Sequence, residues 1–168
     1  MRAGARRPRA ELILSAPRAG PSAPAKRRDG VRQRAEAGVD AVEVVAAVIE
    51  RGGRLLITRR PRGTHLAGLW EFPGGKPRAG ETADQALRRE IDEELGAFVL
   101  VGEPVETVDW EYPDKRVRIT FFRCAIEGEP RALEGQELAW VAPAELAGYE
   151  FPAADAVLIE RLKGGTPT

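Results

Sequence analysis

The chain has 168 residues and a mass of 18.3 kDa, a length that favours one domain and excludes most multidomain enzymes. Apolar residues make up 43% and charged residues 31%, which suits one substantial core, and the 26 basic and 26 acidic side chains cancel. The single cysteine, Cys124, excludes an intramolecular disulfide and a cysteine-based zinc site, and no apolar run approaches the roughly 18 residues that cross a bilayer. We therefore expect a cytoplasmic protein without membrane contacts.

Residues 1–40 differ in composition from the rest of the chain. They carry 10 Arg and Lys against 4 Asp and Glu, and they are rich in Ala, Pro and Gly. We expect a disordered basic arm, because such a segment cannot bury enough apolar surface to fold. Contact of this arm with nucleic acid is a less favoured alternative. Since Met1 is the only methionine, a natural start at Val31 or Val39 also stays open.

From residue 41 the pattern becomes that of a folded domain, which we expect over 41–164, with a short tail over 165–168. A β-branched run over 42–49 is typical of a buried strand, and a Gly-Gly turn separates it from the next apolar run, which predicts a hairpin. The expected elements of this first part are strands over 42–49 and 54–59, a loop over 61–68 and a short extended segment over 69–72.

Residues 82–95 predict a helix. Thr82 and Gln85 match a capping box at its start, and Gly96 is a natural cap at its end. The apolar stripe of this helix consists of Leu87, Ile91 and Leu95.

The second half of the domain predicts further strands over 105–112, 117–126 and 138–141, followed by a closing helix over 153–163. Val157, Leu158 and Leu162 are its expected inward residues. Strands interspersed with helices, and no internal repeat, indicate a mixed α/β domain with a central sheet and at least two helices packed on it.

Three glutamates gather on the predicted helix 82–95. Glu90, Glu93 and Glu94 stand at i, i+3 and i+4, so their carboxylates lie on one side of the last two turns. They repel one another and oppose the negative end of the helix dipole. A divalent cation such as Mg²⁺ removes this conflict. The alternative is a solvated acidic face without a ligand.

The neighbouring residues favour the cation. Gly74 and Gly75 allow a close backbone turn, and Arg89 can orient an adjacent carboxylate through its fork of donors. Gly75, Glu81 and residues 89–96 (REIDEELG) resemble the Nudix box, G-x5-E-x7-R-E-U-x-E-E-x-G-U, where U is aliphatic. All fixed positions are present, and only Ala97 is smaller than is usual at the last aliphatic position.

The resemblance extends beyond this motif over residues 42–162, where the chain is similar to the MutT-like nucleoside triphosphate pyrophosphohydrolases. It implies a Nudix-type α/β/α sandwich, a required Mg²⁺ for which Mn²⁺ can substitute, and cleavage of a nucleoside triphosphate into the monophosphate and pyrophosphate. The segments that carry it are Arg59-Arg60, His65, Leu69–Gly75, Trp110–Asp114, Leu133–Gln136 and Phe151–Asp155.

The same resemblance implies the site residues. The expected metal ligands are Gly74, Glu90, Glu93 and Glu94. The expected catalytic residues are Glu90, Glu93, Glu94, Glu134 and Arg89. Glu90 is the first choice for the residue that accepts the proton of the attacking water, and Glu134 is the second. Glu81 is expected to brace the loop against the helix, and Lys76 is a second candidate for phosphate contact. The expected substrate contacts are Arg60, His65, Glu71, Phe72, Pro73, Gly74 and Asp155.

For each of three side chains, the sequence allows both a structural role and a role in binding the base. Trp70 and Phe72 share one face of a strand, so either can stack on a base, although core packing is favoured for Trp70. Asp155 stands where MutT-like enzymes place a base-reading asparagine. It either binds the base, or it caps the final helix.

These observations lead to one favoured function and two alternatives. The favoured function is hydrolysis of 8-oxo-dGTP, which removes a damaged nucleotide from the pool and so serves DNA replication and DNA repair. The first alternative is hydrolysis of CTP or a modified dCTP. The second is a catalytically silent Nudix domain that binds nucleotides, against which the intact carboxylate set argues. The sequence leaves the oligomeric state open.

Overall fold

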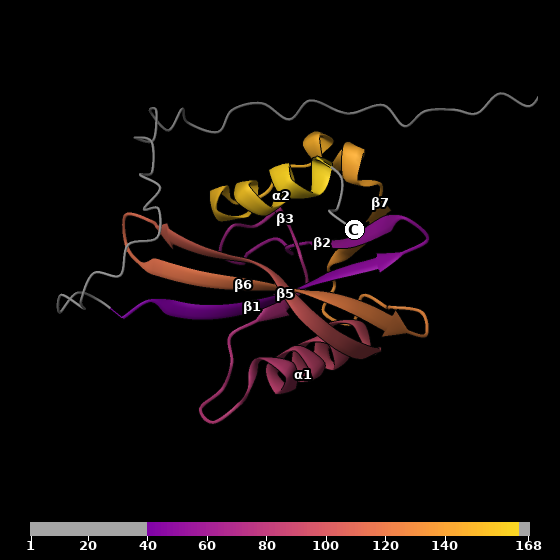
Figure 1. Cartoon of the computed structure of the whole chain (residues 1–168), viewed down its shortest axis with the longest axis horizontal. Helices are drawn as coiled ribbons and strands as arrows, with labels where there is room; N and C mark the ends of the chain where they lie inside the picture. The colour runs from indigo at the N-terminus through magenta and orange to yellow at the C-terminus, as the bar shows by residue number, and fades with distance from the viewer. Residues whose placement is uncertain (1–39, 165–168) are drawn as a thin grey trace, which may run out of the picture. The chain divides into compact units, whose positions relative to one another are not determined.

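A computed structural model describes residues 40–164, so the expected tail and all of the expected arm except Asp40 lie outside the described residues. The described part contains a seven-stranded mixed sheet. Helix α1 (Ala83–Leu95) covers one face of it and helix α2 (Ala156–Lys163) covers the other (Figure 1). The expected α/β/α arrangement is therefore confirmed.

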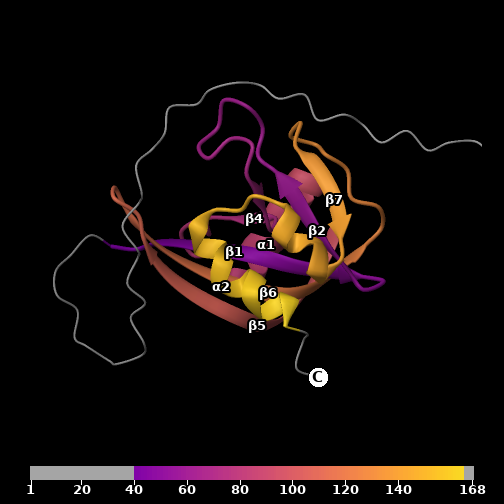
Figure 2. The same cartoon turned by 90° about the horizontal axis from the view of Figure 1, so that it is seen from above.

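The sheet is organised around its first strand. The strands are β1 (Val42–Arg51), β2 (Arg54–Arg59), β3 (Trp70–Glu71), β4 (Gly74–Gly75), β5 (Phe98–Glu111), β6 (Arg116–Glu127) and β7 (Glu137–Val141). Their order is β3-β2-β1-β6-β5, with β4 paired to β1 and β7 paired to β2. Figure 2 shows β7 beside β2 and β5 beside β6. The predicted β1–β2 hairpin is confirmed but short, because β1 pairs mainly with β6, in parallel, over residues 42–49.

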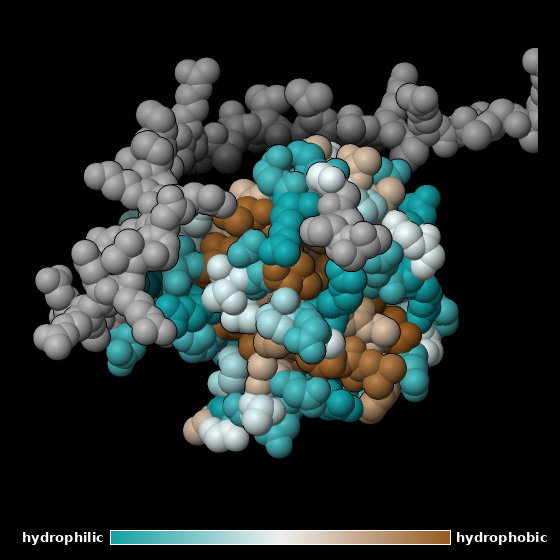
Figure 3. Space-filling view, viewed as in Figure 1, coloured by the Kyte–Doolittle hydropathy of each residue, from teal (hydrophilic) through white to brown (hydrophobic). Residues whose placement is uncertain are grey.

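Strand alternation divides the core into two clusters. Val45, Ala47 and Ile49 of β1 pack toward α1, whereas Ala46 and Val48 pack toward α2. The predicted stripe of α1 is completely buried. In Figure 3, apolar side chains reach the surface where the helices pack against the sheet.

Both ends of α1 follow the sequence. Gln85 donates its peptide N–H to Oγ1 of Thr82 at 3.2 Å, and Thr82 donates its own N–H to Oε1 of Gln85 at 2.9 Å, which confirms the capping box. Gly96 ends the helix with φ of 59°, in the left-handed region that glycine favours.

Strand β5 is longer than predicted: it begins at Phe98, not at residue 105. The strand runs through Gly102 and Pro104, and its pairing with β6 continues past them through two register shifts, between Val101 and Pro104 and between Pro104 and Glu106. Proline is tolerated at such irregularities because its missing N–H leaves no ladder bond unmade there.

The closing helix begins later than predicted. A 3₁₀ turn covers Ala153–Asp155 before α2 starts, and a further 3₁₀ segment, Pro143–Gly148, was not predicted. Leu158 is buried, and Val157 and Leu162 pack partly against the core, as expected. Across residues 40–164, no helix is long and apolar enough to span a membrane.

Candidate active site

Strand β4 lies directly on the glutamates of α1, and only glycine fits there. A Cβ on Gly74 would overlap the carbonyl oxygen of Val45. A Cβ on Gly75 would lie only 2.6 Å from Oε1 of Glu90. The peptide N–H of Gly74 donates to the Glu94 carboxylate. The two glycines therefore bring backbone polar groups against the helix face that carries the carboxylates.

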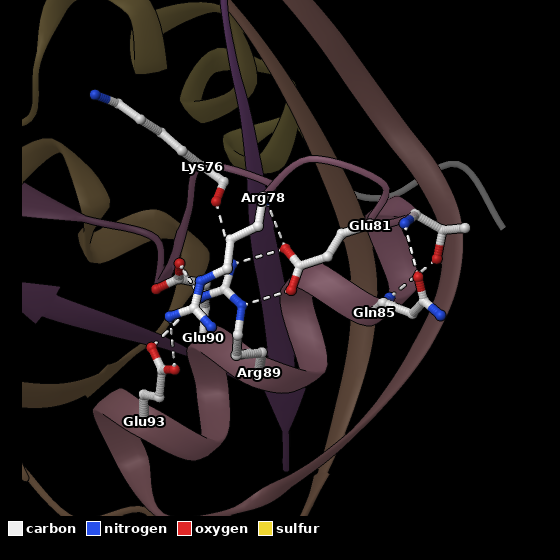
Figure 4. Close-up of polar contacts among 8 residues, drawn as sticks. Lys76, Arg78, Glu81, Gln85, Arg89, Glu90 and Glu93 are labelled. Atoms are coloured by element: carbon white, nitrogen blue, oxygen red, sulfur yellow. Dashed lines mark hydrogen bonds and ion pairs between the residues drawn. The ribbon is translucent and has the colours of Figure 1, made fainter.

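Arg89 fixes the glutamates around it (Figure 4). Its Nε and Nη2 donate to the two oxygens of Glu81 at 2.7 and 2.9 Å, and its Nη1 donates to Glu90 at 2.6 Å. Nη2 also donates to the carbonyl of Lys76 at 3.2 Å, and the N–H of Arg78 donates to Glu81 at 2.7 Å. The hydrogen bonds to Glu81 lower its pKa to about 2, and those from Arg89 have the largest effect. The fork of Arg89 thus contacts the carboxylates of Glu81 and Glu90, and Glu81 connects α1 to the loop residue Arg78.

Glu93 and Lys76 lie apart from the deeper carboxylates. Glu93 accepts from Nη2 of Arg78 at 3.3 Å and from Nη1 of Arg89 at 3.4 Å, and its side chain is 44% exposed. The amine of Lys76 extends away from the glutamates, while its carbonyl faces Arg89 (Figure 4). Glu93 thus lies at the exposed edge of the group that the spacing predicted, and it shares Nη1 of Arg89 with Glu90.

Glu94 is the centre of a carboxylate cluster drawn from three elements. Burial raises its pKa to about 8, and the charges of Glu71, Glu90 and Glu134 add to that rise. The hydrogen bond from Gly74 acts in the opposite direction. Glu71 ends β3, Glu90 lies one turn earlier in α1, and Glu134 belongs to the loop between β6 and β7. The spacing of the sequence predicted that Glu90 and Glu94 lie together on α1. Glu71 and Glu134 were predicted as site residues only from the family resemblance.

The residues of this cluster fit a hard divalent cation. All donors are oxygens, which Mg²⁺ and Mn²⁺ prefer. Arg89 binds Glu90 and Arg60 binds Glu71, whereas the burial of Glu94 beside them favours neutralisation by a proton or a cation. Among residues 40–164, no three acidic, histidine or cysteine side chains already stand at the spacing of a closed metal site. The cluster is therefore a set of candidate ligands, not a finished coordination shell.

The loop that carries Glu134 is tied to the end of α1. Leu133 donates its N–H to the carbonyl of Glu94 at 3.1 Å, and Arg131 donates to the carbonyl of Leu95 at 2.9 Å. Gln136, which is 9% exposed, adds two side-chain hydrogen bonds to this junction. Sequence reasoning gave Gln136 no role, although it lies in a segment that carried the resemblance.

Arg60 connects the loop after β2 to the cluster. Its Nη1 donates to Oε2 of Glu71 at 2.8 Å, and its Nε donates to the carbonyl of His65 at 2.6 Å. Burial raises the pKa of Glu71, and Arg60 counteracts that rise. His65 contributes its backbone to this contact and is exposed. Both residues therefore lie beside the cluster, with Arg60 already engaged by a carboxylate.

Phe72 and Pro73 lie in the core beneath the site. The Phe72 ring is 4% exposed, with its centroid 5.9 Å from that of Phe121 and 5.6 Å from that of Phe151. Pro73 is fully buried. Trp70 packs edge-on against Tyr149 at 5.2 Å, as expected for a core residue. Aromatic packing thus anchors the segment that leads into β4.

Asp155 does not cap the final helix. It lies just before α2, is 6% exposed and makes no side-chain capping hydrogen bond, so the capping interpretation is wrong. Burial raises its pKa to about 7, and the charge of Glu71 adds to the rise. The nearby Tyr112 hydroxyl is bound by the backbone of Ala154. Asp155 is therefore close enough to Glu71 of the carboxylate cluster for their charges to interact.

Comparison with known proteins gives a consistent result. Residues 44–161 match the NUDIX domain family. The chain is 43% identical to an 8-oxo-dGTP diphosphatase of Haemophilus influenzae, over 74% of this chain and 93% of that protein. It is 41% identical to a CTP pyrophosphohydrolase of Escherichia coli, over 71% of this chain and 89% of that protein. The solution structure of the Escherichia coli ORF135 protein matches with a TM-score of 0.67 at 38% identity, covering 75% of this chain and 91% of that one.

The sandwich fold, the glutamates on α1 and the match over most of the chain define the class: the chain belongs to the NUDIX domain family. Ala97, the one departure from the motif, is 6% exposed and packs in the α1 cluster. Within the family, the chain is a Nudix hydrolase similar to the MutT and 8-oxo-dGTP diphosphatase branch. The resemblance stated from the sequence is confirmed.

Proposed function

We propose that this Nudix hydrolase is a Mg²⁺-dependent pyrophosphohydrolase that converts 8-oxo-dGTP and water into 8-oxo-dGMP and pyrophosphate. The observation that carries the proposal is the partly buried Glu94 among three further carboxylates, beside a strand at which only glycine fits. The 43% identity to an 8-oxo-dGTP diphosphatase supports the substrate. Such an activity would clear oxidised precursors from the cytoplasmic nucleotide pool and so serve DNA replication and repair.

Glu90, Glu94 and the carbonyl of Gly74 are the proposed holders of the metal, with Glu93 at the edge of the set. When bound, Mg²⁺ or Mn²⁺ supplies charge neutralisation at the phosphate oxygens and lowers the pKa of the attacking water. The protein must then accept a proton from that water. Nη1 of Arg89 occupies one oxygen of Glu90 at 2.6 Å, whereas Glu134 is exposed on its loop. The structure therefore favours Glu134 over Glu90 for this role.

Asp155 is the proposed reader of the base, with Arg60 and His65 beside the entry of the nucleotide. An ionised aspartate accepts hydrogen bonds from the N1–H and amino group of a guanine or from the amino group of a cytosine. A protonated one also donates to a carbonyl, which the pKa of about 7 permits. The second candidate substrate is CTP or a modified dCTP, favoured by the 41% identity to a CTP pyrophosphohydrolase.

A nucleotide panel tests the proposal directly. The protein is incubated with Mg²⁺ and 8-oxo-dGTP, dGTP, CTP or 5-methyl-dCTP, and products are separated by anion exchange. We expect 8-oxo-dGMP with pyrophosphate as the fastest reaction, abolished by EDTA and lowered at least about a hundredfold in kcat by Glu94→Gln. Orthophosphate as the main product, or activity in excess EDTA, would contradict it. Binding without turnover would identify a silent nucleotide-binding domain instead.

A further inference from the structure

Gln136 joins the two elements that bring Glu94 and Glu134 together. Its Nε2 donates to the backbone carbonyl of Glu94 at 2.8 Å, and its Oε1 accepts from the backbone N–H of Glu134 at 2.8 Å. The two hydrogen bonds span the end of α1 and the loop before β7. One side chain therefore contacts the main chain of both residues.

The chemistry of this position calls for a primary amide. The last carbonyls of a helix lack partners within the helix, and the Glu94 carbonyl accepts two hydrogen bonds from outside it, one from the N–H of Leu133 and one from Gln136. The Glu134 N–H needs an acceptor. Glutamine offers both on one planar group, whereas an ionised glutamate accepts only and leucine does neither. Burial to 9% exposure makes an unmatched polar group costly here.

The two hydrogen bonds of Gln136, here called the bridge, hold the backbone of Glu134 itself and not only the start of its loop. Leu133 and Arg131 already fasten the preceding residues to the carbonyls of Glu94 and Leu95. Glu134 itself is exposed, and its peptide N–H is held by Gln136. Without Gln136, the loop would stay attached, but the direction of the Glu134 side chain would be set less tightly.

We propose that Gln136 is a positioning residue that sets the Glu134 carboxylate against Glu94 and the reacting phosphate, through its two main-chain hydrogen bonds. The proposal rests on the proposed function, because it takes the role of Glu134 from there. Gln136 has no contact with the nucleotide in this scheme. Its loss should therefore lower the rate of the chemical step and leave substrate binding nearly unchanged.

The first test compares two glutamines that each bind a backbone N–H. Gln136→Leu should lower kcat about ten- to hundredfold, the usual effect of losing a partner that orients a catalytic group, with KM within about twofold. Gln85→Leu is the matched control, because Gln85 accepts from the N–H of Thr82 in the capping box. It should lower the melting temperature and leave kcat unchanged at equal folded fraction. An equal kcat for Gln136→Leu and wild type would overturn the proposal.

A conservative variant guards against a protein that fails to fold. Gln136→Glu keeps the acceptor for the Glu134 N–H, and it can donate to the Glu94 carbonyl only while it is protonated. Relative to wild type, its kcat should therefore recover as the pH falls from 8 to 6. A ratio of kcat values that does not change with pH would argue against the bridge.

A double-mutant cycle tests whether Gln136 acts through Glu134. In a Glu134→Gln background, adding Gln136→Leu should lower kcat by less than about twofold, because the group that it positions is already disabled. A full ten- to hundredfold loss in that background would show that Gln136 acts on something else.

Hydrogen exchange tests the bridge without turnover. In the metal-free protein, the amide of Glu134 should lose protection in Gln136→Leu, while the amides of Leu133 and Arg131 keep theirs and Gln85→Leu changes none of the three. Equal protection of Glu134 in wild type and variant would overturn the proposal. A wild type that hydrolyses no nucleotide would instead refute the proposed function, and this measurement would still decide the bridge.

Discussion

Removing one charge from the carboxylate cluster should stabilise the metal-free protein. Glu94 is partly buried near Glu71, Glu90 and Glu134, so its ionisation in the fold is opposed by partial burial and by repulsion. Glu94→Gln keeps the shape and resembles the protonated acid. We expect this variant to be more stable than wild type at pH 8 in EDTA and nearly equal to it at pH 5.

The magnitude follows from proton linkage. The pKa of Glu94 is about 8 in the fold against an ordinary value of 4.5, so the folded protein binds more protons than the unfolded chain between these values. The free energy of unfolding then falls by up to about 1.4 kcal/mol for each pH unit, beginning near pH 4.5 and complete above about pH 8. From pH 5 to 8, the Glu94 contribution is a loss on the order of 4 kcal/mol.

Urea unfolding in EDTA at pH 5, 6, 7 and 8 measures this difference. Asp155, with its pKa raised to about 7, adds a slope of the same sign, but it is common to both proteins and cancels. Asp92→Asn, an exposed carboxylate on the same helix, is the matched control and should follow wild type. Mg²⁺ at pH 8 should stabilise wild type and leave Glu94→Gln nearly unchanged. Parallel curves for wild type and Glu94→Gln would refute the reasoning.

Three further predictions follow from contacts at the site. Gly75→Ala should fold, because the atoms nearest to its new Cβ belong to the end of the Glu90 side chain, and it should lose at least about tenfold in kcat because Glu90 must shift. Gly74→Ala, whose Cβ meets the backbone of Val45 and Ala46, should give no folded protein by circular dichroism. Arg89→Lys, which replaces a fork with one donor group, should lower kcat at least about tenfold, and a kinetically normal variant would contradict the orienting role. Asp155→Asn should abolish any change between pH 6 and 8 in the ratio of kcat/KM for 8-oxo-dGTP and CTP, and an unaltered pH dependence would end the base-reading proposal.

Local signals in the sequence sufficed for α1 and its glutamates. Thr82, Gln85 and Gly96 fix the ends of the helix by contacts with near neighbours, so the sequence contains the whole argument. The same holds for the Arg89–Glu90 contact. The β1–β2 hairpin was also local, but its short length was not, because the residues of β6 that pair with β1 in parallel lie 75 positions further along the chain, as in Val42 and Val117.

Other features depend on contacts that periodicity does not contain. The register shifts that carry β5 past Pro104 depend on the facing strand. Asp155 resembled a helix cap by its position in the chain, yet the 3₁₀ turn buries its side chain and leaves the cap unmade. The meeting of Glu71, Glu94 and Glu134 depends on three chain segments that only the fold brings together.

The distribution of cations explains why one carboxylate of the cluster should respond most to a metal. Arg89 holds Glu90 at 2.6 Å and Arg60 holds Glu71 at 2.8 Å, so both anions already have a partner in the protein. Glu94 has the N–H of Gly74 and a pKa of about 8, so at neutral pH it binds a proton that a divalent cation must displace. Metal affinity should therefore rise with pH up to about 8, through Glu94. The pH dependence of kcat/KM would then originate in metal binding by Glu94 rather than in the carboxylate that accepts the proton of the attacking water.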